Sequence, residues 1–119
     1  TRAPHENFYH GFLNGLLAAV RDYIGDFQSE AESGRGYADI TFSSYDGASS
    51  VVIEVKYASD AAARLQELAS KAIAQIEEKG YAAALCSEGS DRVIECGIAF
   101  RGRECAVRCK ELLPAGVQE

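Results

Sequence analysis

The chain has 119 residues, of which 47% are apolar and 25% charged, and its formal net charge is −6. This length and composition are typical of one packed domain and exclude an extensively disordered chain. The apolar runs are far shorter than the roughly 18 residues of a membrane span, and the first residues form no secretion signal. The excess of acids argues against a broad nucleic-acid surface, because affinity for phosphates comes largely from Lys and Arg. A metal site would account for some of these acids, so a smaller nucleic-acid site stays open.

Residues 1–119 are therefore predicted to form a single domain. Met is absent, and the chain opens almost directly on a predicted helix. This favours a piece taken from a longer protein, with removal of an initiator Met before Thr1 as the alternative. The tail over residues 112–119, with Pro114 and Gly116, is expected to fray.

The chain has four cysteines, none in a C-x-x-C pair and none with a histidine nearby: Cys86, Cys96, Cys105 and Cys109. Zinc sites usually combine closely spaced cysteine or histidine pairs. We therefore expect reduced, mostly buried thiols in a cytoplasmic protein, with neither zinc nor a disulfide.

The first predicted element is a helix over residues 6–23, with Pro4 suited to its first turn. One face carries an apolar stripe, and Glu6 and His10 lie on a separate polar edge. Gly25 is expected to end the helix. A first strand is predicted over residues 26–32 and a turn over residues 33–36.

A β-hairpin is predicted next, because Asp46-Gly47 stands between apolar runs at residues 37–42 and 51–57. Centring the hairpin on Asp46-Gly47 places Asp39 opposite Glu54 and Thr41 opposite Val52. Side chains alternate along a strand, so Glu54 and Lys56 share one face. Two acids directly opposed destabilise a sheet and raise the pKa of at least one of them. A divalent cation between Asp39 and Glu54 would remove that conflict.

The second half of the chain is predicted to be a helix followed by three strands. Ser59 or Asp60 can cap the helix, which ends at Gly80, and alanines on its apolar face permit close packing on the sheet. The strands are expected at residues 81–86, 93–100 and 104–109. The strand over 81–86 is expected to lie parallel to that over 51–57, because a helix connects them. The predicted fold class is α/β, a mixed β-sheet with flanking helices in the order α-β-β-β-α-β-β-β.

Asp39 followed by Glu54-Val55-Lys56 resembles the D…ExK signature of the PD-(D/E)XK nuclease superfamily. The resemblance extends to residues 6–10 (ENFYH), to residues 34–36 (GRG), and to Gln75-Ile76 with Tyr81. In order and spacing the chain is similar to a bacterial branch whose domain often follows an ATPase-like domain. The sequence departs from the signature at Ala38, where a Pro usually precedes the Asp.

The resemblance implies a restriction-endonuclease-like core and a cytoplasmic, metal-dependent nuclease. Asp39 and Glu54 would bind Mg²⁺ or Mn²⁺, which prefer oxygen ligands, together with the Val55 carbonyl and Glu6. Lys56 would position or deprotonate the attacking water, and Gln75 would orient substrate or water. Substrate contacts are implied for three further residues, Arg35, Tyr81 and His10.

Structural alternatives stay open for several of these residues. Glu6 can be an acid favoured by the helix dipole, Arg35 a solvated loop residue, and Gln75 an amide in a structural hydrogen bond. For the whole chain there are three hypotheses. They are a phosphodiesterase acting on DNA or RNA, a nuclease-fold binding or regulatory module attached to an ATPase-like domain, and a structural domain whose ion pair is incidental.

Overall fold

The computed structural model describes residues 24–29, 39–87 and 89–113, together with Gly11, Gly15, Leu17 and Ala18. These four residues have helical backbone, as predicted, and the rest of the first helix lies outside the described residues. The turn predicted over residues 33–36 also lies outside them. The described elements follow the order β1 (Ile24–Ser29), β2 (Ile40–Ser44), β3 (Ser49–Tyr57), α3 (Leu65–Lys79), α4 (Tyr81–Ser87), β4 (Arg92–Arg101) and β5 (Glu104–Leu112).

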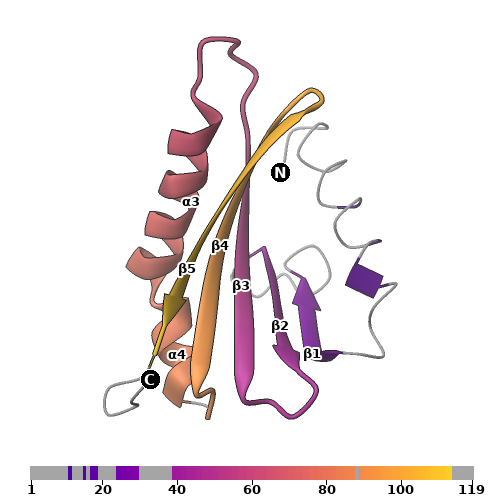
Figure 1. Cartoon of the computed structure of the whole chain (residues 1–119), viewed down its shortest axis with the longest axis vertical. Coiled ribbons are helices and arrows are strands. Elements are labelled where there is room, and N and C mark those ends of the chain that lie inside the picture. The colour runs from indigo at the N-terminus through magenta and orange to yellow at the C-terminus, as the bar shows by residue number, and fades with distance from the viewer. Residues whose placement is uncertain are drawn as a thin grey trace.

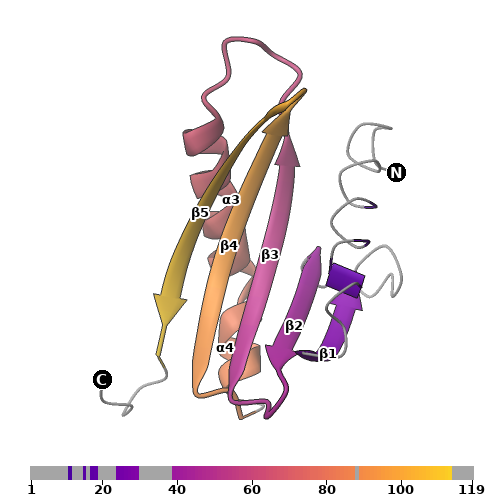
Figure 2. The same ribbon diagram turned by 45° about the vertical axis from the view of Figure 1, so that its right-hand side comes forward.

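The strands form one mixed sheet in the order β1-β2-β3-β4-β5 (Figure 1). Neighbouring strands are antiparallel except β3 and β4, which are parallel. A parallel pair needs a crossover, and α3 and α4 provide it. Figure 2 shows both helices behind the sheet. The predicted fold class, a mixed sheet with flanking helices, is confirmed.

The hairpin of β2 and β3 has the predicted register, with Thr41 paired to Val52 and Ile40 to Ile53. Its turn is held by Asp46, whose Oδ1 accepts hydrogen bonds from Ser44 Oγ (2.6 Å) and the Ala48 N–H (3.0 Å). The Ser44 hydroxyl lowers the pKa of the Asp46 carboxyl by stabilising its charged form. Gly47 has a φ of 77°, a left-handed conformation that glycine adopts without strain.

Helix α3 packs on the sheet through Ala69, Ala72 and Ile76, all fully buried. The approach is closest at Gly97 of β4, where an added Cβ would lie 2.0 Å from the Ala69 carbonyl oxygen. The close packing that the alanines predicted is confirmed, and it requires glycine on the facing strand.

Residues 81–86, predicted as a strand, belong to helix α4. The segment has three consecutive alanines and no β-branched residue, a composition that favours a helix. A short apolar run does not by itself distinguish a strand from a buried helix. The parallel neighbour of β3 is therefore β4.

Three boundaries also differ from prediction. Strand β1 begins at Ile24 and continues through Gly25, which pairs with Ser43, and residues 30–32 lie outside the described part of the chain. Strand β5 extends to Leu112, which pairs with Val93, so Leu112 does not belong to a frayed tail. Residues 114–119 lie outside the described residues.

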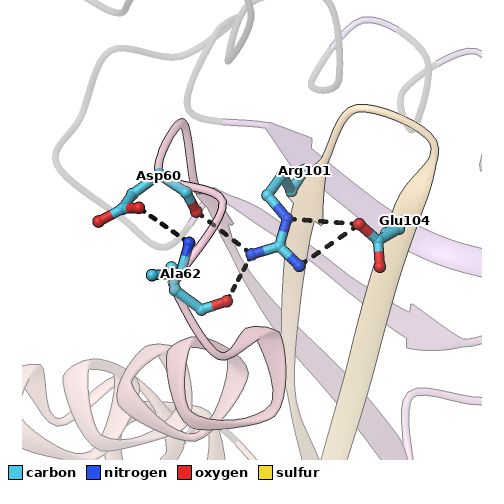
Figure 3. A network of polar contacts seen from close by, with 5 residues as sticks. Asp60, Ala62, Arg101 and Glu104 are labelled. Carbon is cyan, nitrogen blue, oxygen red and sulfur yellow. Dashed lines mark hydrogen bonds and ion pairs between the residues drawn. The ribbon is translucent and has the colours of Figure 1, made fainter.

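The third boundary is the start of α3, which begins at Leu65 rather than after Asp60. Asp60 instead closes a turn by accepting the Ala62 N–H at 2.8 Å. Arg101 of β4 fixes this loop, because its Nη1 donates to the carbonyl oxygens of Asp60 (3.2 Å) and Ala63. Figure 3 shows its guanidinium between this loop and Glu104 of β5, whose carboxylate it also binds at 3.3 Å. The loop thus folds against the β4–β5 turn.

All four cysteines are free thiols. The expectation that most are buried is wrong, since Cys105 and Cys109 are exposed and Cys86 and Cys96 half-buried. β5 is an edge strand, and most of its side chains remain in contact with solvent. Among the described residues, no helix has the length and apolar character needed to cross a membrane.

Candidate active site

Asp39 and Glu54 lie side by side where β2 begins. The ladder ends at the Ile40–Ile53 pair, so Asp39 directly precedes β2 rather than belonging to it. The Asp39 N–H donates to Glu54 Oε1 at 3.4 Å, and Asp39 Oδ2 accepts the Val55 N–H at 2.7 Å. The Asp39 side chain therefore extends the hydrogen bonding between β2 and β3. The two acids are neighbours, as expected from the hairpin.

Both acids are nearly removed from water, Asp39 being 8% exposed and Glu54 6% exposed. Burial raises the pKa of Glu54, and the negative charge of Asp39 raises it further. The Asp39 N–H and the charges of Lys56 and Lys79 oppose that rise. A bound cation would stabilise Glu54 in this position, because a nearby positive charge favours the ionised form of a carboxyl group.

Lys56 follows Glu54 on the sheet face covered by α3. Its Nζ donates a hydrogen bond to Gln75 Oε1, and Gln75 projects from α3. The parallel register shows why Glu54 and Lys56 lie on this face. Glu54 pairs with Gly97 and Lys56 with Ala99, and these two β4 residues are buried under α3. The structure therefore brings four of the predicted site residues to one region: Asp39, Glu54, Lys56 and Gln75.

Val55 lies in the same region, since its N–H bonds to Asp39, whereas Tyr81 is placed elsewhere. Tyr81 opens α4 and packs against the core cluster that contains Val52 and Ile76. Glu6, His10 and Arg35 lie outside the described residues.

A buried acid that the sequence reasoning did not single out is Glu95 of β4. It is fully buried, and neither carboxylate oxygen has a hydrogen-bond partner among the described residues. Glu95 pairs with Val52 and lies two residues before Gly97, so it shares the α3 face with Glu54. The available signal was its alternation in phase with Gly97 and Ala99.

The pKa of Glu95 is raised to about 7, mainly by burial and further by the charge of Glu77 on α3. Lys110 of β5 pairs with Glu95 in the ladder and opposes the rise. The Lys110 amine also binds the Glu77 carboxylate at 2.6 Å, so the positive charge of Lys110 is shared between Glu77 and Glu95. Glu95 is therefore protonated over much of the acidic range, unlike an ordinary glutamate.

The donors around Asp39 and Glu54 fit a hard divalent cation. Both side chains offer oxygen ligands. A strand residue directs its N–H and C=O to the same side, so the Val55 carbonyl faces the Asp39 side, as its N–H does. Within the described residues, no three His, Cys, Asp or Glu side chains are grouped closely enough to hold a metal alone. A further ligand must then come from the Val55 carbonyl, from water, or from outside the described residues.

Comparison with known protein families identifies the superfamily to which the chain belongs. Residues 4–110 match the PD-(D/E)XK nuclease superfamily, a span that includes every residue of the candidate site. Comparisons with curated proteins and with solved structures returned no match. Nucleases of this superfamily generally use divalent metal ions and act on nucleic acids. The match covers most of the sequence, and the mixed sheet with its flanking helices agrees with it, so the chain belongs to the PD-(D/E)XK nuclease superfamily.

Proposed function

We propose that the chain is a metal-dependent nuclease domain that hydrolyses phosphodiester bonds, with DNA as the expected substrate. The observation that carries the proposal is the grouping of Asp39 and Glu54, two buried and adjacent acids, with the Lys56–Gln75 pair beside them. Two buried acids in contact repel each other, and a bound cation would relieve that repulsion, which supports a metal-binding role.

In this proposal Asp39, Glu54 and the Val55 carbonyl hold Mg²⁺ or Mn²⁺, and Glu6 is a further ligand. When bound, such an ion polarises the scissile phosphate and lowers the pKa of a water molecule. Lys56 orients or deprotonates the attacking water, or stabilises the negative charge that develops on the oxygens of the pentavalent phosphorane. Gln75 holds the Lys56 amine in place through its side-chain oxygen.

Contacts to the substrate are assigned to Arg35, His10 and Tyr81, and these assignments remain predictions. A cytoplasmic location and attachment to an ATPase-like domain in a longer parent chain are likewise part of the proposal. The net charge of −6 favours a second function, a catalytically weak or inactive nuclease-fold module that binds or regulates and is attached to an ATPase-like domain.

Incubation of the purified chain with supercoiled plasmid tests the proposal. Nicked or linear DNA is expected with Mg²⁺ or Mn²⁺ and none with a chelator, because the reaction needs the cation. The Glu54→Gln variant serves as the matched control and should leave the plasmid intact. A folded wild-type chain that does not cut the plasmid with either ion would favour the binding or regulatory module instead.

A further inference from the structure

Two cysteines face each other across the β4–β5 pair, on the far side of β4 from α3. Cys96 and Cys109 are direct partners in the antiparallel register, and their Sγ atoms lie 3.0 Å apart. The other two cysteines are placed differently, since Cys105 pairs with Phe100 and Cys86 lies in α4.

The backbone at this position suits a disulfide. Directly opposed residues of antiparallel strands have Cα atoms about 4.5 or 5.5 Å apart. A disulfide accepts Cα separations of about 4.4–6.8 Å, so the two strands need not move for the bond to form. The closed ring would contain residues 96–101 of β4, the turn at Gly102 and residues 104–109 of β5.

We propose that Cys96 and Cys109 form a reversible thiol–disulfide site that responds to small-molecule disulfides such as oxidised glutathione. The inference does not depend on the nuclease activity, because both thiols lie on the sheet face opposite Glu54 and Lys56.

The two thiols have different roles in the exchange. Cys109 is exposed and therefore meets the oxidant, whereas burial and the neighbouring Cys109 raise the pKa of Cys96 to about 12. The Cys109 thiolate attacks one sulfur of the oxidant, breaks its S–S bond and releases one thiolate. The sulfur of Cys96 then attacks Cys109 and displaces the second oxidant thiolate, which takes up the Cys96 proton. The net reaction oxidises two protein thiols to one disulfide and reduces the oxidant to two thiols.

The bond would tie the edge strand β5 to β4, the strand that lies next to the β3 residues of the candidate active site. A cross-link stabilises a fold largely by restricting the unfolded chain. The oxidised chain is therefore expected to unfold several degrees above the reduced chain, and a thiol reductant should reverse that shift.

The experiment equilibrates the reduced chain with oxidised and reduced glutathione, alkylates the remaining thiols, and maps the peptides by mass spectrometry. The expected product has Cys96 joined to Cys109, while Cys86 and Cys105 are alkylated. Cys109→Ser should prevent the bond and the rise in melting temperature. Cys105→Ser, a change at an exposed cysteine of the same strand, should leave both unchanged.

Alkylation of all four cysteines after equilibration with fully oxidised glutathione would overturn the proposal. So would a disulfide that involves Cys105, or a disulfide between two chains, because the register predicts a bond within one chain. A Cys96–Cys109 bond that left the melting temperature unchanged would contradict the proposed stabilisation.

Discussion

Replacement of Lys56 by alanine is expected to slow Mg²⁺-dependent DNA cleavage by at least about 10²-fold while leaving metal binding intact. The Lys56 amine is not a metal ligand in the proposed site, but it lies on the same strand face as Glu54 and bonds to Gln75. Removal of its positive charge takes away a group that acts on the water or on the developing phosphorane. The measurement is the rate of plasmid nicking at saturating Mg²⁺, with the Mn²⁺-induced rise in melting temperature as the readout for the metal.

Two further variants sharpen this test. Lys71→Ala removes a charge from an exposed position of α3 and should not change the nicking rate. Gln75→Ala should slow nicking by about 10–100-fold, because it releases the Lys56 amine without removing it. Wild-type nicking by the Lys56→Ala chain would remove Lys56 from the mechanism. Loss of the Mn²⁺ effect in the same variant would instead make Lys56 a contributor to the metal site.

Replacement of Glu95 by glutamine is expected to stabilise the chain increasingly as the pH rises. Burial raises the pKa of Glu95 in the folded chain from 4.5 to about 7. The folded chain keeps this proton where the unfolded chain has released it, so stability falls as the pH rises from 4.5 to about 7. Glutamine carries no titrating proton. The difference in unfolding free energy between Glu95→Gln and wild type should therefore grow by about 1–3 kcal/mol between roughly pH 5 and pH 8.

Denaturant unfolding of both chains at the two pH values measures this difference in unfolding free energy. The test is how much the difference changes between the two pH values, rather than its size at either one. An uncharged amide at this buried position carries its own cost, which is the same at both pH values. Glu67→Gln, at an exposed position of α3, controls for the loss of one negative charge. A difference that stays constant from about pH 5 to pH 8 would mean that Glu95 is already ionised at the lower pH.

The hairpin was predictable because local signals agree. Asp46-Gly47 fixes the turn, alternation fixes the faces, and together they place Asp39 beside Glu54 without knowledge of the rest of the fold. The α3 stop at Gly80 was equally local, since its φ of 73° is a conformation that glycine readily adopts.

The features that were missed depend on tertiary contacts. Alternation gives β4 two faces, but the crossing of α3 at Gly97 decides which one is buried, and this places Glu95 inside. Arg101 contributes to the late start of α3 from a strand about forty residues away, because it holds the Asp60 and Ala63 carbonyls. Contacts between residues so distant in sequence leave no local pattern.

The central claim is that Asp39 and Glu54 together hold a divalent cation, and thermal denaturation with and without Mn²⁺ tests it most directly. At a free concentration about a hundredfold above the dissociation constant, Mn²⁺ should stabilise the wild type by about 2.7 kcal/mol. This corresponds to a melting shift of several degrees. Asp39→Asn and Glu54→Gln should lose most of that shift. Without metal they should melt at or above the wild-type temperature, because the repulsion between the two acids is gone. An equal Mn²⁺ shift in all three chains would show that the ion binds elsewhere and would contradict the proposed site.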